Sequence, residues 1–396
     1  MLRAARYLDV GTGNLVSPAV LVVDGSRIQS VNPATTPAGA RVLDLGESTL
    51  LPGLMDVHTH LLLGLEEDWV NWPVKETAAD FALRGARNAR RTLLAGFTTV
   101  RDLGSGAFAD VALARAIDRG FVPGPRMIPS AHALSITGGH CDITGFAPGV
   151  VETTPHEGVA DGVEEVLKAV RYQIKHGAKV IKICATAGVL SFEGPVGALQ
   201  YSPEELRAAA EETHRHGLKI AAHAHGTEGI IAASEAGIDS IEHNSILTEE
   251  AARVIQRNGT FVVPNLYLNE AIDLDALPPP IRAKEEYIQP LVGESFRLSL
   301  RMGLKIAFGT DAGVYPHGDN AKELGYQVEL GQTPIGAIRS ATVVAAELLG
   351  LDDRGRIEPG LLADVIAVRG NPLEDVRELE RVTFVMKGGE VFKHER

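Results

Sequence analysis

Short apolar segments that alternate with helical patterns are the strongest constraint on the fold of this chain. The clearest helical patterns have apolar residues at i, i+3 and i+4 and a glycine near the end, and they cover residues 81–96, 162–177 and 202–217. The candidate strands are eight in number: LMDVHTH, FTTVRDL, RMIPSA, KVIKIC, KIAAHAH, DSIEH, FVVPN and KIAFGTD. Eight strands and helices over about 300 residues match a (β/α)8 barrel. A doubly wound open sheet is the alternative, but no glycine-rich phosphate loop follows a strand.

The two ends of the chain have a different pattern. The beginning holds short strand-like segments, with Asp24-Gly25 at a hairpin turn, and it shows no helical pattern. The end is similar, with Gly388-Gly389 between two strand-like segments. We therefore predict one small sheet domain made from both ends, which places the termini close together.

Charge and composition narrow the class of protein. The formal net charge is −13 and no cluster of Lys and Arg is found, which argues against nucleic acid as a partner. The first residues lack the apolar stretch of a secretory signal, and no apolar run approaches the roughly 20 residues of a membrane span. The two cysteines, Cys141 and Cys184, form no disulfide framework and suggest a reducing compartment. A cytoplasmic protein without a membrane partner is expected.

Polar side chains recur at the ends of the predicted strands. His58 and His60 are two residues apart, so both face the same side of their strand. Lys182, His223, His243 and Asp311 stand at or near the ends of four other strands. Because the carboxyl ends of barrel strands open onto one face, these side chains are expected to gather on one rim.

Each of these residues alone has a simpler interpretation. A single strand histidine is more often a core or surface residue, an aspartate after a strand often caps a helix, and a buried lysine needs a partner. The repetition at the same relative position of several strands argues against chance. Histidine and aspartate suit zinc or a similar transition metal.

The ordered set resembles the amidohydrolase superfamily of metal-dependent hydrolases. The resemblance rests on LPGLMDVHTH with its His-x-His motif, on the lysine of the fourth strand, on the histidines of the fifth and sixth strands, and on the aspartate of the eighth. The segment RGRIEPGLLADVIAV resembles the family's return into a β-sandwich. The resemblance implies a β-sandwich domain of residues 1–53 and 359–396 and a (β/α)8 metal-dependent hydrolase barrel of residues 54–358.

The resemblance also implies a binuclear metal centre. The implied ligands are His58, His60 and Asp311 for one divalent ion, His223 and His243 for the other, and a carbamate on Lys182 between them. Zinc is the first expectation, with manganese and cobalt as alternatives. Asp311 is also expected to transfer protons during catalysis.

Four further residues are weaker candidates. His140 follows Gly138-Gly139 after the third strand, and the resemblance implies that it contacts the substrate or its carbonyl group, so we assign it a catalytic role beside Asp311. His225, Tyr267 and His317 are candidate substrate-binding residues. For each of them, packing at the rim or ordering of a loop is the structural alternative.

The local sequence resembles one branch of the superfamily, which includes Xaa-Pro dipeptidases, Arg/Lys carboxypeptidases and ochratoxin-type amidases. The segments GFTTVRDLGS, VIKICATAGVLS and AAHAHG carry this resemblance. It implies attack of a metal-activated hydroxide on the amide bond of a small molecule: a dipeptide, a C-terminal amino acid or an N-acyl amino acid. A cyclic amide or lactone hydrolase of the imidazolonepropionase type is the alternative, against which Lys182 argues. A non-catalytic member of the fold would need no metal.

Substrate preference is expected to lie in the loops after the strands, at 144–160 and 270–290. The second segment contains the acids Asp273, Asp275, Glu285 and Glu286, among others. They would attract a basic side chain, although ordinary charged surface is the commoner explanation. The oligomeric state is left open, a homo-oligomer included.

Overall fold

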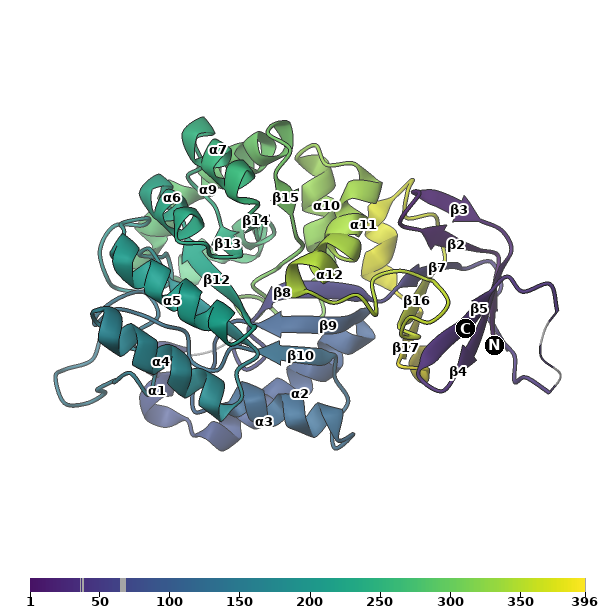
Figure 1. The fold of residues 1–396 in the computed structure, drawn as a ribbon, viewed down its shortest axis with the longest axis horizontal. Helices are drawn as coiled ribbons and strands as arrows, with labels where there is room; N and C mark the ends of the chain where they lie inside the picture. The colour runs from purple at the N-terminus through teal and green to yellow at the C-terminus, as the bar shows by residue number, and fades with distance from the viewer. Residues whose placement is uncertain (36, 38, 65–68, 396) are drawn as a thin grey trace.

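The computed structural model describes residues 1–35, 37, 39–64 and 69–395. It has an α/β part and a β part that lie side by side (Figure 1). All eight predicted strand segments are strands: β8 (Leu54–Thr59), β9 (Phe97–Asp102), β10 (Arg126–Pro129), β11 (Val180–Cys184), β12 (Lys219–Ala224), β13 (Ser240–His243), β14 (Phe261–Val263) and β15 (Lys305–Ile306). The predicted alternation of strands and helices is therefore confirmed.

The strands of the α/β part are parallel and follow chain order. They pair as β10-β9-β8 and as β11-β12-β13-β14-β15. Isolated parallel bridges join Leu134 to Ile183 of β11, and Thr59 of β8 to Ala312 beyond β15. The carboxyl ends of these strands thus lie on one side of the α/β part, which is where the predicted site residues stand.

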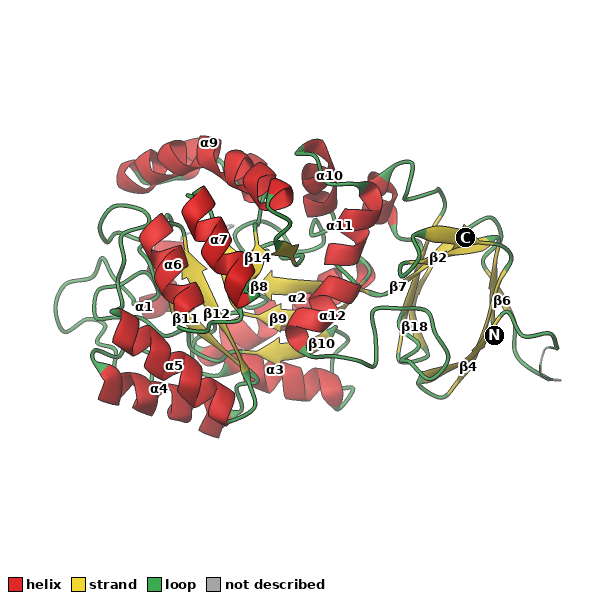
Figure 2. Cartoon of the chain, turned by 45° about the horizontal axis from the view of Figure 1, so that its top comes forward, coloured by secondary structure: helices red, strands yellow, loops and turns green. Residues whose placement is uncertain are grey.

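Helices cover the outside of these strands (Figure 2). They are α1 (Trp72–Lys75), α2 (Ala78–Leu94), α3 (Ala109–Asp118), α4 (Val163–His176), α5 (Pro203–Arg215), α6 (Thr227–Glu235), α7 (Glu249–Asn258), α8 (Leu268–Ala271), α9 (Pro279–Arg301), α10 (Lys322–Glu329), α11 (Pro334–Ser340) and α12 (Val343–Leu349). The start of α5 follows its sequence, because Ser202 and Glu205 form a capping box and Pro203 occupies the first position. No helix of the described ranges is both long enough and apolar enough to cross a bilayer.

The segment 270–290 is not the loop that the sequence suggested. Its second half is the beginning of α9, whose first turn contains Pro279 and Pro280. Proline fits the first turn of a helix because its missing N–H group has no intrahelical partner there. Glu285 and Glu286 are therefore presented with helical spacing, which points them in different directions.

The β part combines strands from both ends of the chain, as predicted. Its strands are β1 (Leu2–Ala4), β2 (Arg6–Asp9), β3 (Asn14–Val16), β4 (Ala19–Asp24), β5 (Arg27–Val31), β6 (Leu43–Asp44), β7 (Thr49–Pro52), β16 (Val365–Val368), β17 (Phe384–Lys387) and β18 (Glu390–His394). They form two sheets, β5-β4-β1-β6 and β18-β17-β16-β7-β2-β3. Leu21, Leu50 and Phe384 belong to one buried cluster shared by both sheets. The exact domain boundaries stay a prediction.

One expectation about the cysteines is wrong. Cys141 and Cys184 form a disulfide, with 6.1 Å between their Cα atoms and 43 residues between them in sequence. Cys184 ends β11, and Cys141 lies in the loop after β10. The sequence could not predict this disulfide, because the two segments come together only in the folded protein. It removes the argument for a reducing compartment, and a cytoplasmic location stays a prediction.

Candidate metal centre

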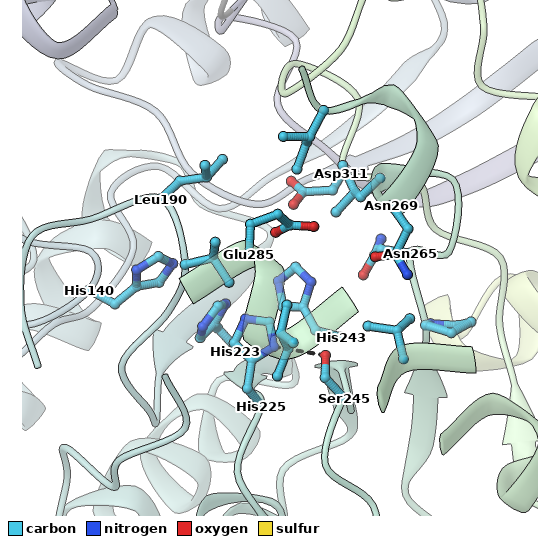
Figure 3. A pocket seen from close by; sticks show the side chains of 16 residues that line it. His140, Leu190, His223, His225, His243, Ser245, Asn265, Asn269, Glu285 and Asp311 are labelled. Carbon is cyan, nitrogen blue, oxygen red and sulfur yellow. Dashed lines mark hydrogen bonds between the residues drawn. The ribbon is translucent and has the colours of Figure 1, made fainter. Parts of the chain in front are cut away.

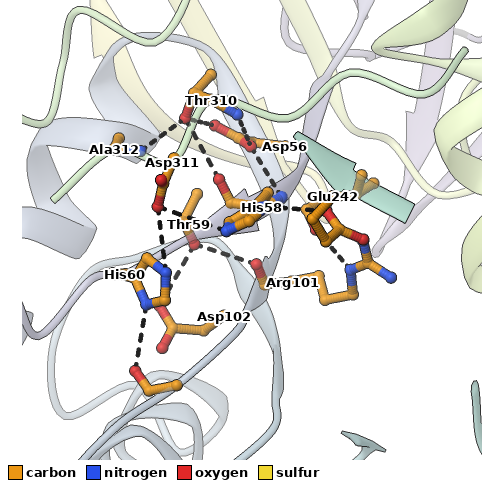
Figure 4. A network of polar contacts seen from close by, with 12 residues as sticks. Asp56, His58, Thr59, His60, Arg101, Asp102, Glu242, Thr310, Asp311 and Ala312 are labelled. Atoms are coloured by element: carbon orange, nitrogen blue, oxygen red, sulfur yellow. Dashed lines mark hydrogen bonds and ion pairs between the residues drawn. The ribbon is translucent and has the colours of Figure 1, made fainter. Parts of the chain in front are cut away.

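The first group of candidate ligands consists of His58, His60 and Asp311, whose ligand atoms lie within 4.8 Å of one another (Figure 4). Asp311 Oδ1 is 3.4 Å from His58 Nε2 and 3.2 Å from His60 Nε2. Burial opposes ionisation of Asp311, but the two histidines outweigh it and lower the pKa of Asp311 to about 2. The carboxylate is therefore anionic at neutral pH, as a metal ligand must be.

The second group consists of His223, His225 and His243, also with ligand atoms within 4.8 Å of one another. Burial and the neighbouring histidines hold the pKa values of His223 and His243 well below the usual range, and burial lowers that of His225 to about 3. All three imidazoles are therefore neutral near pH 7 and able to ligate a cation. The two groups are adjacent, because the rings of His58 and His243 lie 5.2 Å apart.

The donor set fits a metal. His223 Nε2 is buried and has no hydrogen-bond partner among the residues described. Buried polar atoms nearly always have a partner, so an imidazole nitrogen without one, among other histidines, fits a role as a metal ligand. His225 belongs to the same group, but its Nδ1 is 2.8 Å from Ser245 Oγ, which leaves Nε2 as its only ligand atom.

Lys182 lies on β11 and interacts electrostatically with both groups of candidate ligands. Its side chain is buried, and its charge lowers the pKa values of His58 and His223, one from each group. Burial lowers the pKa of Lys182 itself to about 8. An ammonium group at this position would repel a divalent ion, whereas an anionic derivative of the amine would bind it.

Two buried acids hold the first group in place. Glu242 Oε2 is 2.8 Å from His58 Nδ1, and Arg101 Nη2 donates to Glu242 Oε1 at 2.8 Å. This contact directs Nε2 of His58 toward the candidate metal position. Asp56 accepts hydrogen bonds from the backbone N–H groups of His58 and Thr310, at 3.1 and 3.2 Å, and so joins β8 to the segment that carries Asp311.

The backbone is strained at the ends of several strands. His243, Asn265 and Asp311 have φ angles of 70°, 51° and 59°. Non-glycine residues rarely adopt this left-handed conformation, which concentrates at functional sites. These three residues lie at or after the carboxyl ends of β13, β14 and β15, and all three line the pocket described below.

A pocket with about 520 Å³ of empty volume opens beside the second group (Figure 3). It is lined by His140, Val189, Leu190, His223, His225, His243, Ser245, Pro264, Asn265, Leu268, Asn269, Ile272, Glu285, Ile288, Val292 and Asp311. Its lining combines apolar side chains with a few polar groups, as small-molecule sites do.

Comparison with known proteins identifies the family. The model of the amidohydrolase family matches residues 49–392. The chain belongs to the amidohydrolase family. It is 38% identical over 369 residues to ochratoxinase from Aspergillus niger, covering 87% of this chain and 75% of that one. It is 27% identical over 390 residues to imidazolonepropionase from Deinococcus radiodurans, covering 94% and 90%.

A solved structure supports the same assignment. A Xaa-Pro dipeptidase with bound methionine in its active site superposes with a TM-score of 0.94 at 36% identity, covering 99% of both chains. Together with the family match, these relatives show that this amidohydrolase is a hydrolase acting on C–N bonds. The resemblance drawn from the sequence is confirmed.

The predicted substrate contacts of this amidohydrolase fall into two sets. His140 and His225 line the pocket, and Ser191 Oγ lies 2.6 Å from His140 Nδ1. Tyr267 and His317 are not among the described residues that line it. The Tyr267 hydroxyl accepts a hydrogen bond from Lys322 at 3.1 Å, and His317 Nε2 lies 3.1 Å from the carbonyl oxygen of His60. The substrate-binding role of both residues stays a prediction.

Sequence reasoning missed three residues of the site. Glu242 stands within the predicted strand DSIEH, and Arg101 stands within the predicted strand FTTVRDL, and two opposite charges within barrel strands were a signal for a buried ion pair. Asn265 ends β14 as the histidines end their strands, and both of its side-chain polar atoms are buried without a partner among the residues described. An unpaired amide that lines the pocket is suited to a hydrogen bond with a ligand.

Proposed function

We propose that this amidohydrolase holds two divalent metal ions, with zinc as the first candidate, at the rim of a closed (β/α)8 barrel. We further propose that it hydrolyses the amide bond of a dipeptide, of a C-terminal amino acid or of an N-acyl amino acid. The observation that carries the proposal is the pair of adjacent ligand groups beside one pocket. The bridges that join the two sheets in chain order support the closed barrel.

The first ion would lie among His58, His60 and Asp311, and the second beside His223 and His243, with His225 as a further nitrogen within reach. Lys182 would take part as a carbamate, which turns a repulsive ammonium group into an anionic oxygen ligand. When bound, the ions supply Lewis acidity to the scissile carbonyl and to the attacking water.

The residues of the chain supply the proton transfers and the orientation. Asp311 accepts a proton from the attacking water and returns it to the leaving nitrogen, a role that its ionised carboxylate allows. His140 contacts the substrate through Nε2, because Ser191 and Glu193 lie 2.6 and 3.4 Å from its Nδ1. The Asn265 amide is placed to bind a polar group of the substrate.

A second candidate function rests on the similarity to imidazolonepropionase. This candidate is the hydrolysis of a cyclic amide or a lactone. The buried Lys182 beside two ligand groups favours the binuclear amidase over this alternative.

Metal content and a substrate screen test the proposal on protein purified without chelator. About two ions per chain and turnover of dipeptides or N-acyl amino acids would support it. One ion per chain, or activity only on cyclic amides and lactones, would favour the second candidate.

A further inference from the structure

Helix α9 forms one wall of the pocket. Glu285, Ile288 and Val292 stand on it at positions i, i+3 and i+7, so they share one face. All three line the pocket (Figure 3). The relative exposures of Glu285 and Ile288 are 4% and 2%. An acidic residue thus occupies a position that the helix otherwise gives to apolar side chains.

Glu285 differs from the other acids of its segment. The side chain of Glu286 is 51% exposed and pairs with Arg282, and that of Asp275 is 88% exposed and pairs with the same arginine. Asp273 accepts a hydrogen bond from the backbone N–H of Asp275. These three acids are ordinary surface or capping residues, and Glu285 alone among the four faces the pocket.

Within the described part of the protein, no hydrogen bond or charged neighbour offsets the burial of the Glu285 carboxyl group. The adjacent cation is committed elsewhere, because Lys284 Nζ donates to the carbonyl oxygens of Gly188, Ser191 and Glu193 at 3.2, 2.9 and 2.7 Å. Burial raises the pKa of the Glu285 carboxyl to about 7. The carboxyl group is therefore partly protonated at neutral pH, and a bound cation would stabilise its charged form.

The surroundings of Glu285 limit that ligand. Val189, Leu190, Leu268 and Ile272 line the same pocket, and they offer no charge. At the candidate metal centre, the neutral imidazoles and the anionic aspartate would bind the metal ions. These groups are therefore not the ones expected to bind an organic cation. Outside the candidate metal centre, Glu285 is thus the acidic side chain of the described pocket lining, and it stands next to surfaces that suit an apolar side chain.

We propose that Glu285 binds the ammonium group of the substrate, so that the preferred substrates are dipeptides with a free amino group and an apolar first residue. This inference rests on the proposed amidase function and narrows it. N-acyl amino acids with an uncharged acyl group fit less well, because they leave the carboxylate buried and unpaired. A basic side chain of the substrate would also place a cation beside Glu285. The experiment below distinguishes it from the α-ammonium group.

Three matched substrates test the inference. Leucyl-leucine carries the α-ammonium group, 4-methylpentanoyl-leucine has the same shape without it, and 6-aminohexanoyl-leucine carries an ammonium group at the end of the chain. We expect the protein to prefer leucyl-leucine over the uncharged analogue by about 10- to 100-fold in kcat/KM. We expect Glu285→Gln to abolish this ratio, whereas Glu286→Gln, on the exposed face of the same helix, retains it. A Glu285-dependent preference for 6-aminohexanoyl-leucine would identify a basic side chain as the ligand instead. Equal turnover of all three substrates would overturn the inference.

Direct binding separates this inference from the proposed function. Isothermal titration with 3-methylbutan-1-amine, and with 3-methylbutan-1-ol as the neutral probe, needs no turnover. Saturable binding of the amine that Glu285→Gln weakens about tenfold or more supports the cation site, even where no dipeptide is hydrolysed. Hydrolysis of dipeptides together with amine binding that Glu285→Gln leaves unchanged would refute the cation site and leave the amidase intact. Circular dichroism of both variants checks that they fold.

Discussion

The Nδ1 atom of His58 lies 2.8 Å from Oε2 of Glu242, beneath the first group of candidate ligands. Arg101 binds the other oxygen of the same carboxylate, and all three side chains are almost fully buried. A carboxylate on one ring nitrogen of a histidine sets the tautomer, and it raises the basicity of the other nitrogen. Glu242 is thus a positioning residue for the proposed centre.

Replacement of Glu242 by Gln should weaken the first metal position. The amide removes the negative charge behind His58 and leaves Arg101 with an uncompensated buried charge, so we expect a loss of metal and a decrease of about 10- to 100-fold in activity. A lower Tm should accompany the change. Elemental analysis, kinetics and thermal unfolding of the variant measure these effects. Glu249→Gln, on the surface of α7, is the control, and a Glu242→Gln protein with full metal and full activity would contradict the positioning role.

Asp311 should matter for turnover more than for metal binding. Asn at this position retains the shape but cannot accept a proton, so we expect kcat to decrease by a factor on the order of 10² to 10⁴. Steady-state kinetics and metal content of Asp311→Asn measure the two effects separately. Asp319→Asn, further along the same loop, should behave as the parent protein. A near-normal kcat in Asp311→Asn would exclude its role in proton transfer.

Lys182 should carry one added CO₂. Beyond the mass of any bound metal, the native mass of the protein is then expected to exceed the mass of the sequence by one CO₂, and acid should remove this excess because carbamates decompose when protonated. Native and denaturing mass spectrometry test this difference. Lys182→Met should lose both the excess mass and part of the metal, whereas Lys179→Met, at the exposed start of the same strand segment, should retain them. A native mass that the sequence and the bound metal account for completely would show an unmodified amine.

The strands and their terminal side chains could be predicted because their signals are local. An apolar run followed by a polar residue is visible at His223, at His243 and at Asp311 without any knowledge of neighbours. The parallel order of the strands then carries each side chain to the same side of the sheet. Once a parallel barrel is assumed, the carboxyl ends of its strands lie on one face, and this is enough to predict that these side chains lie together.

The rest of the site depends on contacts between distant segments. Glu242 is recognisable as a positioning residue only once Arg101 and His58 lie beside it. Glu285 differs from Glu286 by one position, and only the phase of α9 turns the first into the pocket and the second toward solvent. Pairing of this kind is not a property of either segment alone.

The disulfide should contribute measurably to stability. Cys141 and Cys184 close a segment with a sequence separation of 43 residues, for which the chain-entropy model gives about 4 kcal/mol. We expect unfolded, unreduced protein to show no reactive thiol, and we expect a reductant to lower the Tm. Thiol titration and thermal unfolding with and without reductant test this. Cys141→Ser should have the Tm of the reduced parent protein both with and without reductant. Two reactive thiols per unreduced chain would contradict the pairing.

The buried Glu323 should make stability depend on pH in a predictable direction. Burial raises the pKa of its carboxyl to about 8, although it accepts a hydrogen bond from the backbone N–H of Tyr267 at 2.8 Å. The folded-state pKa of Glu323 lies above the unfolded value of 4.5. The contribution of Glu323 to the free energy of unfolding is therefore complete below pH 4.5 and is lost as pH rises toward 8. From pH 5 to pH 7.5, the loss amounts to about 3 kcal/mol, at about 1.4 kcal/mol for each pH unit.

Glu323→Gln should therefore gain stability relative to the parent protein as pH rises. Gln keeps an oxygen for the N–H of Tyr267 and has no charge to bury, so the difference in the free energy of unfolding between variant and parent should move by about 3 kcal/mol in favour of the variant between pH 5 and pH 7.5. Urea unfolding at both pH values measures this difference. Glu294→Gln, on the exposed face of α9, should show no such change. A constant difference between Glu323→Gln and the parent would mean that Glu323 is ionised throughout this range.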